Sequence, residues 1–299
     1  MKHPLLKDYL LLLLVAAIWG TSFSMIKIGV SEIGPATLTA GRILIAALAL
    51  VIWLRFVLRT HLDLSAPALL SYAVIGLFGN ALPFTLIAWS EQTLDSSLTA
   101  VLMGIMPLFT VIMAHFFLKD EPFSSRALTG IMLGFFGLMV LLGASAWNDT
   151  GKELLSQITV LVASLSYAGV TIFVRRQVTA SGVEVATGAL VVGTVFAFII
   201  AFTLENPTEM NWGLRAVLPM IILGLFPTAL ASVLYFRLVR NLGATRFAQI
   251  NYIIPVFGSI IGVFAMGEQT EWRMWIALVL VLSGIFLVHG ARRGAPRVL

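Results

Sequence analysis

The sequence lacks cysteine entirely and contains few charged residues. None of its 299 residues is cysteine, which excludes disulfides, thiolate catalysis and cysteine-based metal sites. Charged residues make up 11% and hydrophobic residues 59% of the chain, whereas soluble domains average about 25% charged and about 45–50% apolar residues. Mean hydropathy is +0.99. This balance predicts an all-α integral membrane protein, because long apolar runs cross a bilayer as helices.

Patterns typical of enzymes and metal sites are also missing. The sequence has no HExxH motif and no pair of acids inside an apolar run, and TGKE at 150–153 lacks the glycine spacing of a phosphate loop. The four histidines are scattered at His3, His61, His115 and His289. We therefore expect no enzyme activity, metal or cofactor. The net charge of +5 does not indicate nucleic-acid binding, because the arginines lie in short gaps between apolar runs.

Apolar stretches between charges and turn residues predict ten transmembrane helices. Each is close to the roughly 20 residues that cross a bilayer core. The N-terminal MKHPLLKDY leads into the first span, which we interpret as an uncleaved helix and not a signal peptide. The predicted spans are 8–29, 35–57, 66–90, 95–118, 125–145, 154–176, 183–204, 214–238, 244–266 and 272–291.

Lysine and arginine predict the orientation of these spans. If the N-terminus is cytoplasmic, fourteen of the nineteen Lys and Arg residues fall on the inner side. The outer side or the outer helix ends hold only Lys27, Arg42, Lys152, Arg215 and Arg273. This bias predicts that both the N- and C-termini are cytoplasmic.

The chain matches itself at an offset of 148 residues. IGLFGNALPFTLIAWS (75–90) aligns with LGLFPTALASVLYFRL (223–238), and GIMPLFTVIMAHFFLKDE (104–121) aligns with YIIPVFGSIIGVFAMGEQ (252–269). Each copy would hold five spans, and this odd number makes the second copy enter the membrane from the opposite side. The predicted organisation is a first five-helix repeat at 1–146, a periplasmic linker at 147–153, an inverted repeat at 154–291 and a basic cytoplasmic tail at 292–299.

Three segments resemble a known superfamily. AIWGTSFSMIKIGV (17–30), the run from SEQTL to VLLG (90–143) and its echo from LVRNL to IFLV (238–288) resemble the drug/metabolite transporter superfamily, in particular EamA-type ten-helix exporters, which include YddG-like exporters of aromatic amino acids. The resemblance implies a multi-pass carrier of the bacterial inner membrane that exports small metabolites. It also implies a central cavity lined by the first, third, fourth, sixth, eighth and ninth spans. The second copy departs from the pattern, since Tyr167-Ala168 replaces Trp19-Gly20.

The inverted repeat itself predicts a secondary transporter that works by alternating access. We expect its substrates to be amino acids, aromatic or otherwise neutral. A multidrug, nucleobase or cationic-drug transporter of the same fold is the alternative, and a channel or receptor is the alternative of a different class. Besides the substrate, the expected partner is the lipid bilayer. The GxxxG spacing of Gly130 and Gly134 leaves a monomer and a weak homodimer both open.

Matching interruptions in the two copies predict the substrate path. Pro107 and Pro255 are equivalent, and prolines at corresponding places in two halves point to a transporter site, although a structural kink without ligand is the alternative. Residues on the same helix faces, or at equivalent positions, complete the predicted cavity. They are Trp19, Ser22, Asn80, Phe84, Ala100, Gly104, Tyr167, Thr171, Thr228, Ser232, Asn251 and Tyr252.

Several of these residues also allow a purely structural role. Asn80 is either a substrate contact or an interhelical hydrogen bond, because an amide inside an apolar span is costly unless it is paired. Trp19 and Tyr167 are an equivalent pair that lies away from the helix ends, where an aromatic belt would be expected. They either line the cavity or pack against neighbouring helices.

Few ionisable residues lie near the path. Lys27, Arg42 and Glu91 are candidates for a gate or for coupling, with snorkelling as the alternative for the two cations and a solvated loop-edge acid as the alternative for Glu91. Facilitated export and proton antiport both remain open. Acids that close the fourth and ninth spans, Glu121 and Glu268 among them, are predicted to cap the helix that follows.

Overall fold

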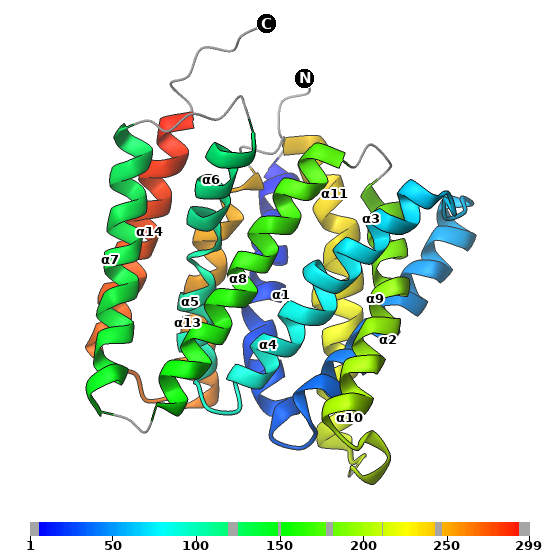
Figure 1. Ribbon diagram of the computed structural model, residues 1–299, viewed down its shortest axis with the longest axis horizontal. Coiled ribbons are helices and arrows are strands. Elements are labelled where there is room, and N and C mark those ends of the chain that lie inside the picture. Colours follow the sequence, from blue (N-terminus) through cyan, green and yellow to red (C-terminus); the bar gives the residue numbers. More distant parts are fainter. Residues whose placement is uncertain are drawn as a thin grey trace, which may run out of the picture.

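The computed structural model describes residues 6–118, 125–148, 151–177, 182–210, 212–242 and 247–292. All regular structure within these ranges is helical (Figure 1). The α-helices are α1 Leu6–Val30, α2 Pro35–Ile52, α3 Ala66–Gly76, α4 Leu82–Ser90, α5 Ser96–Met103, α6 Met106–Phe117, α7 Ser125–Asn148, α8 Lys152–Gln177, α9 Gly182–Leu204, α10 Leu214–Leu223, α11 Ala231–Leu242, α13 Ile250–Met266 and α14 Trp272–Arg292. The other elements are the π-helical segments η1 Trp53–Leu58, η2 Leu77–Ala81 and η4 Gly224–Leu230 and the 3₁₀ turn η3 Pro207–Glu209.

Within the described ranges, seven continuous helical runs are long and apolar enough to cross a membrane. They are Leu6–Val30, Pro35–Leu58, Ala66–Ser90, Ser96–Phe117, Lys152–Gln177, Gly182–Leu204 and Leu214–Leu242. Three shorter apolar helices, Ser125–Leu141, Ile250–Met266 and Trp272–Val288, match the remaining predicted spans. The chain therefore has the composition and the helix lengths of a multi-pass membrane protein.

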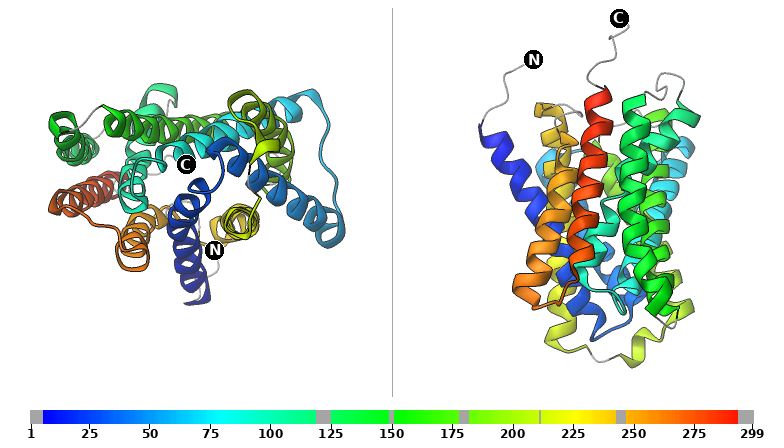
Figure 2. Two further views of the ribbon diagram at one scale, coloured as in Figure 1. Left: turned by 90° about the horizontal axis from the view of Figure 1, so that it is seen from below. Right: turned by 90° about the vertical axis from the view of Figure 1, so that its left-hand side faces the viewer.

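The long helices form one bundle with two distinct ends. Helix α1 begins and α14 ends at the same end, which we call the terminal face, and α1 ends at the other, which we call the opposite face (Figures 1 and 2). Helices α7 and α14 lie side by side at one edge of the bundle (Figure 1). There a Cβ atom on Gly130 would lie 2.6 Å from the carbonyl oxygen of Gly284. The GxxxG face of α7 thus packs within the chain.

Some predicted boundaries differ from the structure. Helices α7 and α8 run into the predicted linker 147–153, because α7 reaches Asn148 and α8 starts at Lys152. The fourth predicted span is broken into α5 and α6 at Gly104 and Ile105. Pro107 stands in the first turn of α6, where a missing N–H costs little. Its equivalent Pro255 instead lies inside the continuous helix α13, so the two copies differ here.

The π-helical segments η2 and η4 occur at the same place in the two copies. Residues 77–81 of η2 correspond to 225–229 of η4 at the offset of 148. In each segment a polar side chain donates a hydrogen bond to the carbonyl five residues earlier: Asn80 Nδ2 to Ile75 at 3.1 Å, and Thr228 Oγ1 to Leu223 at 2.8 Å. Both donors and both acceptors are equivalent pairs, so the wide turn and the side chain that stabilises it recur together.

Equivalent glycines stand where these segments begin, Gly76 just before η2 and Gly224 as the first residue of η4, and bring helices of the two copies into close contact. A Cβ atom on Gly76 would lie 2.6 Å from the carbonyl oxygen of Ala189 and 2.8 Å from the nitrogen of Gly193 in α9. A Cβ atom on Gly224 would lie 2.7 Å from the Cβ atom of Ile45 in α2. Gly193 and Ile45 are themselves 148 residues apart. The two contacts are therefore related by the same duplication that the sequence indicates.

We expect Gly76→Ala and Gly224→Ala each to destabilise the protein by ~1–3 kcal/mol, because the added methyl group would overlap packed atoms of the neighbouring helix. Gly169→Ala is the matched control in α8, where an added Cβ would meet only Met113 Cε at 3.6 Å. Thermal unfolding in detergent measures the effect. Equal midpoints for all three variants would show that the helices are not closely packed at Gly76 and Gly224.

Candidate functional site

Helix α2 places a buried arginine inside the bundle. Arg42 lies about two turns into α2 and is 6% exposed. Its Nε donates a hydrogen bond to Thr228 Oγ1 at 2.8 Å, and its Cζ lies 3.8 Å from the centre of the Phe84 ring. The snorkelling alternative for Arg42 is therefore wrong, because the guanidinium is held among side chains of other helices and does not extend to an interface.

The residues around Arg42 come from both copies. Phe84 belongs to α4, Thr228 to η4 and Tyr167 to α8, and the rings of Phe84 and Tyr167 are 6.5 Å apart. Ser232, in the next turn, donates to the carbonyl of Thr228. Phe84, Tyr167 and Thr228 are predicted cavity residues, and Arg42 is a predicted gate residue. The structure brings these four residues together, and we call them the arginine cluster.

The arginine cluster has unused hydrogen-bonding capacity. Within the described part of the chain, Arg42 makes a single hydrogen bond, to Thr228, and forms no ion pair with a carboxylate. Neither terminal nitrogen of the guanidinium therefore has a hydrogen-bond partner among the described residues. A guanidinium presents its N–H groups as a planar fork that matches a carboxylate or a phosphate. The cluster can thus bind a small anion beside two aromatic rings.

Trp19 is tied to the backbone next to this cluster. Its Nε1 donates to the carbonyl of Pro227 in η4 at 2.9 Å, and its ring lies 6.5 Å from the rings of Tyr235 and Phe247. A related bond occurs in the other copy, where Ser166 of α8 donates to the carbonyl of Phe78 in η2 at 2.6 Å. A first helix of one copy thus supplies the donor for a π-helical carbonyl of the other.

A second group of predicted cavity residues forms a packed helix contact. Ala100 of α5 and Gly104, the residue after α5, are buried against α13, where a Cβ atom on Gly258 would lie 2.4 Å from the Cβ atom of Ala100. A Cβ atom on Gly104 would lie 3.2 Å from the Cγ atom of Pro255. In this conformation helix α13 fills the space beside the small face of α5.

The side chains of the remaining predicted residues make their hydrogen bonds to backbone carbonyls and not to the side chains of the arginine cluster. Tyr252 donates its hydroxyl hydrogen to the carbonyl of Ile285 in α14 at 2.9 Å. Asn251 and Thr171 donate to carbonyls of their own helical turns, and Thr171 is exposed. Ser22 donates to the carbonyl of Trp19. Asn80 likewise bonds within its own helix, a third possibility beside the substrate contact and the interhelical bond.

Lys27 and Glu91 lie at the opposite face. Lys27 Nζ donates to the carbonyl of Leu94 at 2.7 Å, so the ammonium is held against the loop after α4. Glu91, the residue after α4, is 0% exposed. The alternative of a solvated loop-edge acid for Glu91 is therefore wrong.

Two glutamates of the second copy cap helices of the first copy at this face. Glu268 accepts hydrogen bonds from the N–H groups of Ser96 and Ser97 at 2.8 and 2.9 Å, at the start of α5. Glu205 accepts bonds from the N–H groups of Ala36 and Thr37, both at 2.8 Å, at the start of α2. We call these contacts the carboxylate clasps.

The clasps correct the predicted capping pattern. Glu268 does cap a helix, but this helix is α5 of the other copy and not the following helix α14. Lys119, Asp120 and Glu121 lie outside the described residues. Burial raises the pKa of the Glu268 carboxyl, but hydrogen bonds from Ser96 and Ser97 outweigh burial and lower the pKa below its ordinary value of 4.5. Glu268 is therefore ionised at neutral pH.

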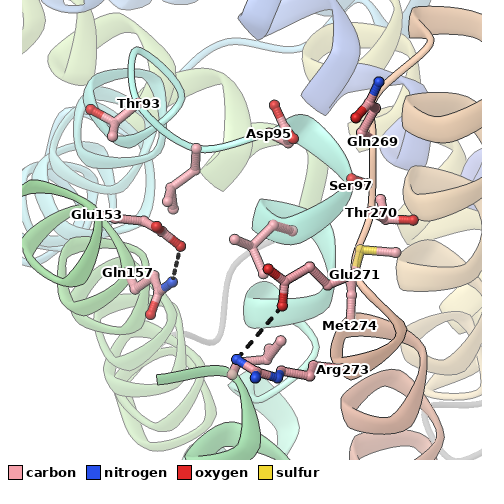
Figure 3. Close-up of a pocket in the computed structure, with 13 residues that line it drawn as sticks. Thr93, Asp95, Ser97, Glu153, Gln157, Gln269, Thr270, Glu271, Arg273 and Met274 are labelled. Carbon is pink, nitrogen blue, oxygen red and sulfur yellow. Dashed lines mark hydrogen bonds and ion pairs between the residues drawn. The ribbon is translucent and has the colours of Figure 1, made fainter. Parts of the chain in front are cut away.

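An acidic pocket of about 380 Å³ lies beside this clasp (Figure 3). Its carboxylates are Asp95, Glu153 and Glu271, with Arg273 3.7 Å from Glu271 and Gln157 donating to Glu153 at 2.9 Å. Burial, followed by the charge of nearby Glu268, raises the pKa of Asp95. Loops and helix ends distant in sequence form this pocket, and no predicted site residue lines it.

Comparison with known proteins identifies the family of this bundle. The model of the EamA-like transporter family matches the chain twice, at residues 6–143 and 154–290. The chain belongs to the EamA-like transporter family. Both matches together span nearly all of the sequence, in agreement with the repeated π-helical segments. The family membership makes the protein a multi-pass membrane transporter and not an enzyme.

Relatives of this EamA protein carry transporter names. It is 26% identical to the uncharacterized transporter YoaV of Bacillus subtilis, over 91% of the chain and 93% of YoaV. It is 28% identical to the uncharacterized inner membrane transporter YedA of Escherichia coli K12, over 91% of the chain and 87% of YedA. A crystal structure that is 18% identical has the same fold, with a TM-score of 0.67 over 97% of the chain and 99% of that structure.

We expect Glu268→Gln to destabilise the protein at neutral pH by about 1–2 kcal/mol, because the neutral amide is a weaker acceptor for the α5 N-terminus. A folded-state pKa below 4.5 means that this stabilisation is complete above pH 4.5 and is lost as the pH falls through the folded-state pKa. Unfolding midpoints measured from pH 7 to pH 3 should therefore converge for the two proteins. Glu271→Gln, at an exposed position, is the control, and a constant difference at all pH values would contradict an ionised clasp.

Proposed function

We propose that this EamA-family carrier exports amino acids with aromatic or other neutral side chains across the bacterial inner membrane. The observation that carries the proposal is the arginine cluster, in which a buried cation without a carboxylate partner lies against Phe84 and beside Tyr167. A charged side chain inside an apolar bundle is costly and is typical of a substrate or ion path.

Different residues of the cluster match different parts of an amino acid. The terminal nitrogens of Arg42 would hold the α-carboxylate in a bidentate pair. Phe84 and Tyr167 would contact an apolar or aromatic side chain through offset or edge-to-face ring packing. A cationic drug is disfavoured, because the positive charge of Arg42 would repel it at the same place.

Alternating access is supported by the relation between the two copies. The family match occurs twice, and equivalent π-helical segments and glycine contacts join each copy to the other. In this proposal ten spans form two inverted five-helix repeats, with the terminal face and both termini in the cytoplasm. The carboxylate clasps join the copies at the opposite face. The conformation described is then the one closed to the outside.

We expect proteoliposomes that contain the protein to exchange labelled phenylalanine for unlabelled phenylalanine, tyrosine or leucine in a saturable counterflow. Phenylalanine methyl ester should compete at least about tenfold more weakly than phenylalanine, because the ester cannot form the charged pair with Arg42. Competition by the ester equal to that of the acid would contradict recognition through the carboxylate. Counterflow that is absent for every amino acid but present for a cationic drug would overturn the proposed substrate class.

Substitution of Arg42 provides the residue-level test. Arg42→Lys should raise the KM for phenylalanine about tenfold and Arg42→Gln should raise it further, since lysine keeps the charge but loses the fork and the ring contact. The matched control is Arg215→Gln at an exposed position at the start of α10. Thermal unfolding of each variant in detergent separates lost binding from lost folding. Unchanged KM values in folded Arg42 variants would remove Arg42 from the site.

The proposed orientation can be tested in a chain that has no natural cysteine. Single cysteines at the exposed positions Glu209, on the opposite face, and His61, on the terminal face, would react with a membrane-impermeant maleimide. In intact cells we expect labelling at position 209 and none at position 61. Permeabilised cells supply the control, because both positions should then react. The reverse pattern would place the termini outside the cell.

A further inference from the structure

Glu91 is a buried acid without a partner. It follows α4 at the opposite face, has 0% exposure, and neither of its carboxylate oxygens has a hydrogen-bond partner among the described residues. No described cation lies within 4.0 Å of the carboxylate. Lys27 Nζ donates instead to the carbonyl of Leu94, and Arg42 Nε donates to Thr228. An ionised carboxylate in this position would be costly to bury, and the charges of Lys27 and Arg42 offset only part of that cost.

The charges around Glu91 come from three neighbouring elements. Lys27 of α1 and Arg42 of α2 favour its ionised form, and Glu268 after α13 opposes it. Glu91 lies just beyond the end of its span. Burial is the largest effect on its carboxyl and raises the pKa well above the ordinary value of 4.5. In this closed conformation burial therefore favours the protonated form of the side chain.

We propose that Glu91 is a proton-binding site, and that a proton and the ammonium group of the transported amino acid occupy its carboxylate in turn. This inference rests on the proposed function, since it needs an amino acid whose carboxylate is held by Arg42. Glu91 and Arg42 both belong to the first copy and are both buried, and each charge acts on the other. One proton would enter the cell for each amino acid exported.

The exchange involves only an O–H bond. When the terminal face opens, the protonated carboxyl loses its proton to cytoplasmic water, and the ammonium group of the arriving amino acid pairs with the carboxylate. When the opposite face opens instead, the amino acid leaves and a proton from outside water takes its place. An empty, ionised Glu91 would disfavour closure of either face, because closure would bury an uncompensated charge.

Proton movement during phenylalanine transport tests the proposal in the wild-type protein. A pH-sensitive dye inside proteoliposomes should report protons moving opposite to phenylalanine, one for each molecule. A pH gradient should drive phenylalanine uphill. With 3-phenylpropanoate, which has the carboxylate but no ammonium group, transport should move no counter-protons. Net transport of phenylalanine without any proton movement would overturn the role of Glu91 and leave the proposed function standing, whereas absence of counterflow for every amino acid would overturn the proposed function itself.

Glu91→Gln is the matching variant, because the amide keeps the shape but cannot release a proton. We expect it to retain phenylalanine exchange at saturating substrate, with KM raised about tenfold, and to lose all accumulation driven by a pH gradient. Glu32→Gln, at an exposed position of the same face, should behave as wild type. A thermal melt in detergent establishes folding of both variants. Gradient-driven accumulation that persists in folded Glu91→Gln would contradict the proposal, and if this variant does not fold, the wild-type dye experiment decides.

Discussion

Polar backbone groups inside apolar helices must find their partners within the protein, because lipid offers none. This constraint governs the contact between the two copies. The π-helical segments η2 and η4 interrupt the regular hydrogen-bond ladder, and side chains from the first helix of the opposite copy, Ser166 and Trp19, donate to carbonyls in these segments. Asn80 and Thr228 satisfy further carbonyls within the same wide turns. Each copy thus donates a side-chain hydrogen bond to a backbone carbonyl of the other.

The buried charges lie where the copies meet. Arg42 of α2 reaches Thr228 of the second copy directly above Phe84, and Glu91 is buried after the end of α4, with Lys27 held against the loop that follows. The carboxylate clasps of Glu205 and Glu268 join the same face. A carboxylate on a helix N-terminus can exchange its partner for water when a face opens. Such a contact holds one conformation firmly and still allows the other to form.

The sequence predicted much of the candidate site, but not how its residues are grouped. Phe84, Tyr167, Thr228 and Arg42 were identified from equivalent positions and from charge, and the structure brings them together. Ala100 and Gly104 were assigned to the same cavity by helical periodicity, yet α13 covers them in this conformation. Periodicity shows which residues share a face of a helix, whereas the neighbour that covers this face is set by packing between distant segments.

Composition, hydropathy and the internal match were sufficient to determine a helical membrane transporter built from two related copies, because apolar length and repeated spacing are local properties of the chain. The tertiary structure decided what no local pattern carries. Glu91 became buried because surrounding elements cover a position at the end of a span, and Arg42 points inward because Thr228 and Phe84, distant in sequence, receive it. Glu268 caps α5 of the other copy because the folded bundle, and not the order of the chain, brings that helix start within hydrogen-bond distance.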